Sequence, residues 1–249
     1  MAVSVATARA LEADGGFTLS EKGAFVAGHS LGEYSALTAV GALTVTDAAK
    51  LLRLRGTSMQ EAVPVGVGAM AALLGLDLDA AQTVAEEAAQ GEVCEAANDN
   101  APGQVVISGA KAAVERACVI AKEAGAKRAM LLPVSAPFHC ALMAPAAEKM
   151  AEALAETDIS VPGLPVVANV KAEAVSDPAE IRELLVSQVT GSVRWRESVQ
   201  WMAAQGVTQL VELGAGKVLS GLARRIDRDL TAANAGTPEE IAALLETLS

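Results

Sequence analysis

A serine lies between two glycines in the segment GHSLG at 28–32, where a predicted strand meets a predicted helix. Residues 24–27 are short and apolar like a buried strand, and residues 31–43 carry apolar side chains at helical spacing without a proline. This pattern is typical of a nucleophile elbow, which exposes a serine hydroxyl at a helix N-terminus. We expect a Cβ at Gly28 or Gly32 to clash with the turn. Ser30 is the candidate nucleophile, and a Gly/Ser-rich loop is the alternative.

A serine hydroxyl needs a base within hydrogen-bond distance, most often a histidine. The chain contains two histidines. His29 lies inside the elbow, where a residue beside the nucleophile usually points away from the reactive oxygen. His139 follows a Pro-Phe pair in a loop before a predicted helix, and by elimination it is the candidate base. The alternative for His139 is a core histidine bonded to the backbone.

The carboxylate that orients the histidine in an α/β-hydrolase is missing from its usual place between Ser30 and His139. A backbone carbonyl can hold the imidazole instead. Arg55, on a helix predicted over 47–61, could bind a substrate carboxylate, because its guanidinium has a fixed fork of donors and stays charged in a desolvated pocket. An ordinary surface arginine is the alternative for Arg55.

Composition excludes several classes of protein. The net charge of −11 and an aromatic content of 2% argue against nucleic-acid binding. The longest run without a charged residue, 129–147, contains three prolines and His139, so we expect no membrane span. Three widely spaced cysteines match neither a disulfide framework nor a zinc site, so we expect reduced thiols, no metal and a cytoplasmic protein.

The predicted elements alternate between helix and strand, which indicates an α/β fold. Residues 67–134 have the order βαββαβ of a ferredoxin-like module, with the polar cluster 98–103 as its central turn. Within this module we predict a helix over 79–89. Residues 1–66 and 135–249 form the α/β pattern on either side of it, in which we predict a strand over 166–170 and a helix over 195–204. The sequence therefore predicts a parallel-sheet, α/β-hydrolase-like large domain, formed by 1–66 and 135–249, with a ferredoxin-like small subdomain at 67–134 inserted into it.

Six segments in combination resemble the malonyl-CoA:acyl carrier protein transacylases. They are GHSLGEYSA at 28–36, RLRGTSMQEA at 53–62, GAMAALLGL at 68–76, NAPGQVVISG at 100–109, PVSAPFHCALM at 133–143 and GAGKVLSGL at 214–222. The resemblance covers essentially the whole chain. It implies an acyltransferase that moves a malonyl group from malonyl-CoA to the phosphopantetheine thiol of acyl carrier protein, through a malonyl-serine, in fatty acid biosynthesis. It implies no cofactor, no nucleic-acid or membrane partner, and a monomer.

The resemblance also assigns roles by position. Ser30 resembles the acylated nucleophile, His139 the base and Arg55 the clamp on the malonyl carboxylate. Gln188 matches the family residue whose main-chain carbonyl orients the histidine, and the Leu31 amide resembles an oxyanion donor. Phe138 resembles the bulky residue of members that prefer malonyl over α-branched substrates, although plain loop packing would explain it equally. The GAGK turn at 214–217 either approaches coenzyme A phosphates or is a plain strand-to-helix turn.

The chain departs from the family pattern at its start. Family members begin with a strand and a Gly-Gln-Gly-Ser-Gln loop whose first glutamine supplies a second oxyanion amide, and several helices precede the one at which this chain opens. We therefore expect an N-terminally truncated large domain. Two alternatives to the transferase are a catalytically impaired fragment that retains only binding contacts, and a serine esterase that uses water as the acceptor.

Overall fold

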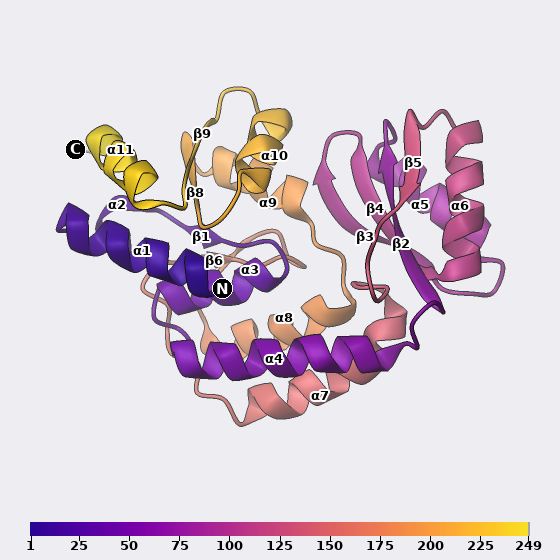
Figure 1. Ribbon diagram of the computed structural model, residues 1–249, viewed down its shortest axis with the longest axis horizontal. Coiled ribbons are helices and arrows are strands. Elements are labelled where there is room, and N and C mark those ends of the chain that lie inside the picture. The colour runs from indigo at the N-terminus through magenta and orange to yellow at the C-terminus, as the bar shows by residue number, and fades with distance from the viewer. Residues whose placement is uncertain (249) are drawn as a thin grey trace. The chain divides into compact units, whose positions relative to one another are not determined.

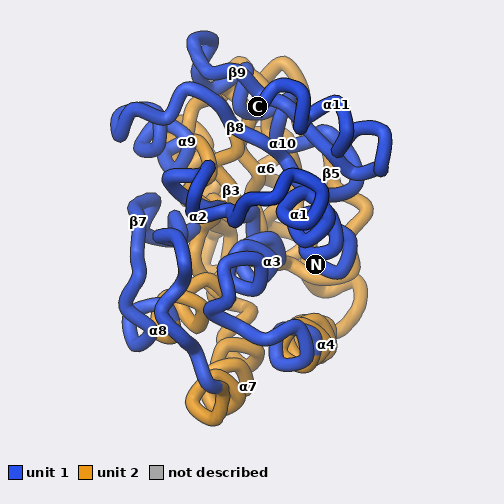
Figure 2. Tube along the Cα trace, turned by 90° about the vertical axis from the view of Figure 1, so that its left-hand side faces the viewer, with its two compact units in different colours: residues 1–49, 158–181, 197–249 blue, residues 50–157, 182–196 orange. Residues whose placement is uncertain are grey.

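The computed structural model describes residues 1–248 and shows an α/β fold. The chain forms two compact units (Figure 2), which are described separately. Unit 1 comprises residues 1–49, 158–181 and 197–249, and unit 2 comprises residues 50–157 and 182–196. A unit boundary falls within each of the helices α4 (Val45–Ala62), α8 (Pro178–Thr190) and α9 (Trp195–Ala204).

Unit 1 contains helices and two small sheets (Figure 1). Besides its parts of α4, α8 and α9, its helices are α1 (Ala2–Gly15), α2 (Leu19–Lys22), α3 (Leu31–Ala39), α10 (Val218–Ile226) and α11 (Pro238–Leu248). Its strands are β1 (Val26–Ala27), β6 (Val166–Val167), β7 (Ala174–Val175), β8 (Gln209–Leu213) and β9 (Thr231–Ala235). Leu11, Ile241 and Leu244 pack with the end of β9 in one of its apolar clusters.

The pairing of β1 with β6 positions the elbow. The two strands are parallel, with Ala27 opposite Val167, and β7 adds antiparallel to the far side of β6. The carboxyl ends of parallel strands meet at the same edge of a sheet, where α/β proteins place their sites. The residues that follow β1, which include Ser30, therefore lie beside the residues that follow β6.

Unit 2 contains a four-stranded antiparallel sheet. The elements run β2 (Gly68–Leu74), α5 (Leu78–Ala89), β3 (Cys94–Ala101), β4 (Gln104–Ala110), α6 (Lys111–Glu123) and β5 (Arg128–Leu131). The strand order is β3-β4-β2-β5, so the ferredoxin-like order predicted from the sequence is present. A short 3₁₀ helix, η1 (Ala141–Met143), and α7 (Ala144–Ala155) follow.

Alternate side chains of this sheet face two different layers, as a strand period of two requires. Leu73, Val105 and Ile107 are buried with apolar residues of α5 and α6. Met70 and Val106 lie in a separate cluster, with Phe138 packed against it. The sheet of unit 2 is therefore covered by helices on one face and contacts the loop that carries Phe138 on the other.

The predicted central turn at 98–103 is wrong in extent. Strand β3 continues through Ala101, and the reversal is made by Pro102 and Gly103, whose φ is 68°. The polar residues stay extended because they gain partners that the local sequence does not reveal. The Asp99 amide donates to the Val193 carbonyl at 3.0 Å, and the buried Asp99 carboxylate accepts from Arg196 Nε at 2.8 Å.

Other elements also differ from the predictions. Strand β6 covers two residues rather than the predicted 166–170, and β7, β9 and α11 are absent from the elements predicted from the sequence. The predicted module at 67–134 lies inside unit 2, and its boundaries stay a prediction.

Burial raises the pKa of the Cys94 thiol from its ordinary value of 9.0 to about 11. A raised pKa of an acid in the folded state means that the unfolded chain releases its proton first as pH rises. The contribution of Cys94 to stability is therefore complete below pH 9 and is lost as pH rises through about 11. Urea unfolding between pH 8 and 11 should show a steeper loss of stability for the unmodified chain than for Cys94→Ala. Parallel curves for the two proteins would contradict this assignment.

Candidate functional site

Ser30 sits on a strained turn at the start of α3. Its backbone angles are φ 51° and ψ −107°, and such a conformation costs a non-glycine residue of order 1–3 kcal/mol. Two short backbone bonds close the turn, from the Gly32 amide to His29 O at 2.8 Å and from the Glu33 amide to Ser30 O at 3.1 Å. The geometry is that of the elbow that the sequence predicts.

The two glycines of the elbow do not have the same role. A Cβ on Gly28 would overlap the carbonyl group of Gly32, so the first glycine is required by the close approach of the two backbones. A Cβ on Gly32 would meet nothing within 4 Å. The expected clash at Gly32 is therefore wrong, because this residue lies in the first turn of α3 with its Cβ direction open.

The amide of Ser30 is bound by Asn169, a residue that the sequence analysis missed. Ser30 N donates to Asn169 Oδ1 at 2.7 Å, and Asn169 is fully buried. A polar residue two positions beyond β6 could have signalled this contact, because β6 is the parallel neighbour of β1. The prediction of one continuous strand over 166–170 obscured it.

The Leu31 amide is the next N–H along the elbow. It opens α3, where amides of the first turn have no acceptor within the helix. Across residues 1–248, no protein acceptor binds this amide. Because the Ser30 amide is committed to Asn169, the Leu31 amide is the elbow donor suited to a developing oxyanion.

His139 lies in unit 2, in a loop that the surrounding backbone holds closely. The residue has a φ of 58° and is 4% exposed. Its Nδ1 lies 2.9 Å from Gln188 O and 3.1 Å from Gly191 O. Carbonyl oxygens only accept hydrogen bonds, so Nδ1 carries the hydrogen and Nε2 of the neutral ring has the lone pair.

Gln188 lies in the last turn of α8, Pro178–Thr190, and Gly191 is the residue that follows the helix. The last carbonyls of a helix have no amide partner within it and carry partial negative charge. They therefore stabilise an imidazolium ring at this position, which is what a base requires after it takes a proton.

Gln188 also contacts Arg55. Arg55 Nη2 donates to Gln188 Oε1 at 3.0 Å, and both residues are buried. One residue therefore binds the imidazole through its main chain and the guanidinium through its side chain. The bond fixes the plane of the guanidinium, which has four further N–H donors.

Phe138 packs on the sheet of unit 2, against the cluster of Met70, Ala97 and Val106. The preceding Pro137 lies against Gly68, where any Cβ would overlap the proline ring. These contacts position the loop, in line with the packing explanation of Phe138. The role of Phe138 in substrate choice stays a prediction.

The structure brings His139, Gln188, Arg55 and Phe138 together in unit 2, and it places Ser30, Leu31 and His29 in unit 1. The catalytic and binding roles of these residues stay predictions.

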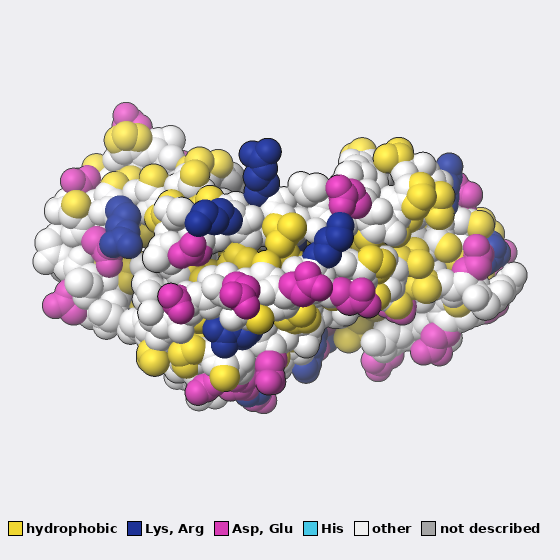
Figure 3. All heavy atoms as spheres, turned by 90° about the horizontal axis from the view of Figure 1, so that it is seen from below, with side chains coloured by type: hydrophobic (Ala, Val, Ile, Leu, Met, Phe, Trp, Pro, Cys, Tyr) yellow, Lys and Arg dark blue, Asp and Glu magenta, His cyan; other side chains and the backbone are white. Residues whose placement is uncertain are grey.

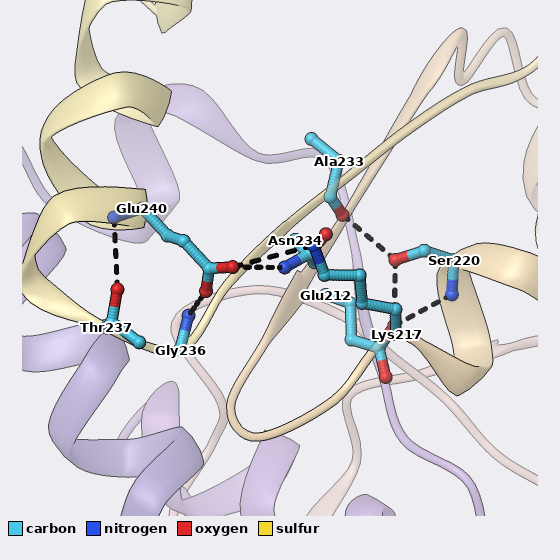
Figure 4. Close-up of polar contacts among 8 residues, drawn as sticks. All are labelled: Glu212, Lys217, Ser220, Ala233, Asn234, Gly236, Thr237 and Glu240. Carbon is cyan, nitrogen blue, oxygen red and sulfur yellow. Dashed lines mark hydrogen bonds and ion pairs between the residues drawn. The ribbon is translucent and has the colours of Figure 1, made fainter.

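The GAGK turn at 214–217 is a plain strand-to-helix turn. Glu212 Oε2 accepts from Ser220 N at 2.8 Å and from Ser220 Oγ at 2.7 Å, so a carboxylate already fills the N-terminus of α10 (Figure 4). Lys217 Nζ lies 3.6 Å from Glu240 Oε1. A phosphate at this turn would meet the negative charge of Glu212, which argues against that use.

Neither a metal cluster nor a membrane helix is found in the described part of the chain. Within residues 1–248, no three His, Cys, Asp or Glu side chains gather as metal ligands would. None of the helices there combines the length and apolar character that crossing a membrane requires.

Comparison with known proteins gives a consistent result. The family model described as "Acyl transferase domain" matches residues 1–245. The malonyl CoA-acyl carrier protein transacylase of Escherichia coli strain K12 is 50% identical over 246 residues, which are 99% of this chain and 78% of that protein. The transacylase of Bacillus subtilis strain 168 is 49% identical over 225 residues, 90% of this chain and 71% of that protein.

Solved structures agree with the sequence matches. An acyl-carrier-protein-S-malonyltransferase from Bartonella henselae superposes with a TM-score of 0.96 at 54% identity, covering 100% of this chain and 79% of that one. A malonyl-transacylase in complex with its type II PKS acyl-carrier protein superposes with a TM-score of 0.95 at 46% identity, covering 99% and 78% of the two chains.

The unequal glycines of the elbow give a matched pair of variants. Gly28→Ala should lower the free energy of unfolding by roughly 2–3 kcal/mol, because its Cβ overlaps fixed backbone. Gly32→Ala should leave stability unchanged or raise it by up to about 1 kcal/mol, because alanine is the better helix former and the space is open. Urea denaturation of both variants measures the difference. Equal losses would show that the backbones of 28 and 32 are not in close contact.

Proposed function

The chain belongs to the acyl transferase domain family, and from that premise we propose that it transfers a malonyl group from malonyl-CoA to acyl carrier protein through a malonyl-Ser30 intermediate. The observation that carries the proposal is the strained serine at the N-terminus of α3, with the Leu31 amide beside it. The transfer belongs to fatty acid biosynthesis. It has no step that needs a cofactor.

His139 is the general base in this proposal. The carbonyls of Gln188 and Gly191 hold its Nδ1–H and leave Nε2 to take the serine proton. The reaction requires this Nε2 to come within hydrogen-bond distance of Ser30 Oγ. Backbone oxygens at the end of α8 take the place of the acid of a serine triad, which agrees with the missing carboxylate in the sequence.

The transfer has two half-reactions of the same form. Ser30 Oγ attacks the malonyl thioester carbonyl as its proton passes to His139, and the Leu31 amide stabilises the resulting oxyanion. The tetrahedral intermediate collapses, the carbon–sulfur bond breaks, and the departing thiolate of coenzyme A takes the proton from His139. The carrier-protein thiol then gives its proton to His139 and attacks the malonyl ester. The bond from the ester carbon to Ser30 Oγ breaks, and Ser30 Oγ takes the proton back from His139, which restores the free hydroxyl and the neutral imidazole.

Arg55 selects the acyl group. Its guanidinium, held by Gln188 Oε1, pairs with the free carboxylate of the malonyl group. An acetyl group would leave this charge without its substrate partner, and omissions of that kind discriminate strongly. Phe138 would add selection against α-branched groups by its bulk.

An acidic carrier protein needs a local basic surface on this acidic chain. In the face of the molecule shown in Figure 3, basic side chains lie among acidic and apolar ones. Some basic side chains already have partners within the chain, since Arg196 pairs with Asp99 at 2.7 Å and Arg224 donates to Ala232 O at 2.7 Å. We also propose that the protein acts as a monomer in the cytoplasm.

The acyl-serine itself is the first test. Incubation of the intact chain with malonyl-CoA should add one malonyl group by mass spectrometry, and Ser30→Ala should abolish the adduct, because Ser30 carries the only side-chain hydroxyl of the segment 28–32. Addition of acyl carrier protein should discharge the adduct onto the carrier. Release of free malonate without a carrier would indicate an esterase. No adduct on a folded chain would indicate a fragment that only binds, and an adduct on Ser30→Ala would exclude Ser30 as the nucleophile.

The carboxylate clamp is tested with two neighbouring arginines. Arg55→Ala should lower kcat/KM for malonyl transfer roughly 100-fold, because charge-assisted hydrogen bonds to the carboxylate are lost, and should spare or raise acetyl transfer. Arg53 lies on the exposed side of the same helix, so Arg53→Ala serves as the control. It should change the kcat/KM of neither malonyl transfer nor acetyl transfer. Equal loss for malonyl and acetyl groups in Arg55→Ala would contradict the clamp.

A further inference from the structure

A single buried carboxamide joins the two sides of the elbow. Asn169 Oδ1 accepts from Ser30 N at 2.7 Å, and Asn169 Nδ2 donates to Gly28 O at 2.8 Å. The two bonds end on the residues immediately before and after His29. The carboxamide therefore spans the tightest part of the turn.

The same residue is also fixed to α3. Its backbone amide donates to Glu33 Oε2 at 3.0 Å, and Glu33 is 3% exposed in the first turn of that helix. A carboxylate is favoured there by the helix dipole. The entry to the elbow, the nucleophile and the first turn of α3 are thus all bonded to one residue.

The Asn169 carboxamide is a planar amide with the same kinds of donor and acceptor as a peptide group. Strands β1 and β6 pair through Ala27 and Val167, and two positions beyond that pair the β1 chain turns away into the elbow. Continued pairing of the two strands would need another backbone amide and carbonyl from the β1 side at this edge of the sheet. The Asn169 carboxamide has an NH2 donor group and a carbonyl acceptor in one plane, so its side chain continues the hydrogen bonding where the backbone no longer can.

We propose that Asn169 is a positioning residue that holds Ser30 in its reactive conformation by bridging Gly28 O and Ser30 N, an inference that rests on the proposed function. The strained φ of 51° at Ser30 persists only when surrounding contacts determine it. Without the bridge, the elbow relaxes and carries both Ser30 Oγ and the Leu31 amide away from the reacting carbonyl. Asn169 is fully buried and its carboxamide is bonded to the elbow on both sides, so we expect its effect to fall on the rate of acylation and not on binding.

Two substitutions separate the two bonds. Asn169→Leu keeps a side chain of similar shape and removes both bonds. It should lower kcat roughly 100-fold, because small displacements of catalytic groups have effects of this size. The KM for malonyl-CoA should stay within about twofold of that of the unmodified chain. Asn169→Asp keeps the acceptor for Ser30 N but removes the donor to Gly28 O. Its kcat should lie between those of the unmodified chain and Asn169→Leu. The rate of Ser30 labelling by a fluorophosphonate, which reports the nucleophile without malonyl-CoA, should follow the same order.

The control is a variant that loses stability elsewhere in unit 1. Leu244→Ala removes a buried side chain of α11 and should lower the urea midpoint of unfolding without touching the elbow bonds. The labelling rate of folded Leu244→Ala should equal that of the unmodified chain. If it falls as far as that of Asn169→Leu, the effect is one of general stability and the inference fails.

The remaining outcomes are also decisive. If either Asn169 variant is folded at the assay temperature and keeps kcat and labelling within about threefold of the unmodified chain, the bridge does not position Ser30. If Asn169→Leu does not fold, the one-atom change in Asn169→Asp decides by the same criterion. A malonyl adduct that survives in Ser30→Ala would overturn the proposed function itself. The Ser30→Ala experiment therefore comes first, so that a failure of the proposed function is distinguished from a failure of the Asn169 proposal.

Discussion

The contact of the Gly28 backbone with the carbonyl of Gly32 is the constraint on which the rest of the site depends. It allows the chain to leave β1 and enter α3 within three residues, and that abrupt change places the serine hydroxyl and the Leu31 amide side by side. A wider turn would expose the hydroxyl but would move it away from the helix N-terminus. The strain at Ser30 is then sustained by hydrogen bonds to residues far along the chain, of which Asn169 supplies two.

The local patterns of the sequence predict much of this structure. The alternation of apolar residues and the turn signals between 68 and 131 indicate the ferredoxin-like order, and the α5 and α9 helices begin close to their predicted positions. The elbow is predictable because the serine, the glycine at 28 and the flanking strand and helix are adjacent in sequence. In each of these cases, the residues that determine the conformation are neighbours along the chain.

The features that could not be predicted depend on distant partners. Asn98 and Asp99 have turn-forming side chains, yet they extend β3 because residue 193 pairs with that strand. Asn169 looks like a strand residue or a turn residue until β6 is known to lie beside β1. The assignment of Gln188 came from family resemblance, since nothing in the local sequence of α8 shows that its carbonyl faces a histidine 49 positions earlier.

Gln188 binds the imidazole with its main chain and the guanidinium with its side chain, and this shared support limits how the protein can diverge. A change of the side chain at 188 alters the support of Arg55, and a shift of its main chain alters the support of His139. Under the roles proposed above for Arg55 and Phe138, new acyl preferences are easier to reach through replacements at 55 or 138 than at 188, because those leave the carbonyl of residue 188 in place. Under the same proposal, replacements at 188 would change the reactivity of the histidine together with the acyl preference.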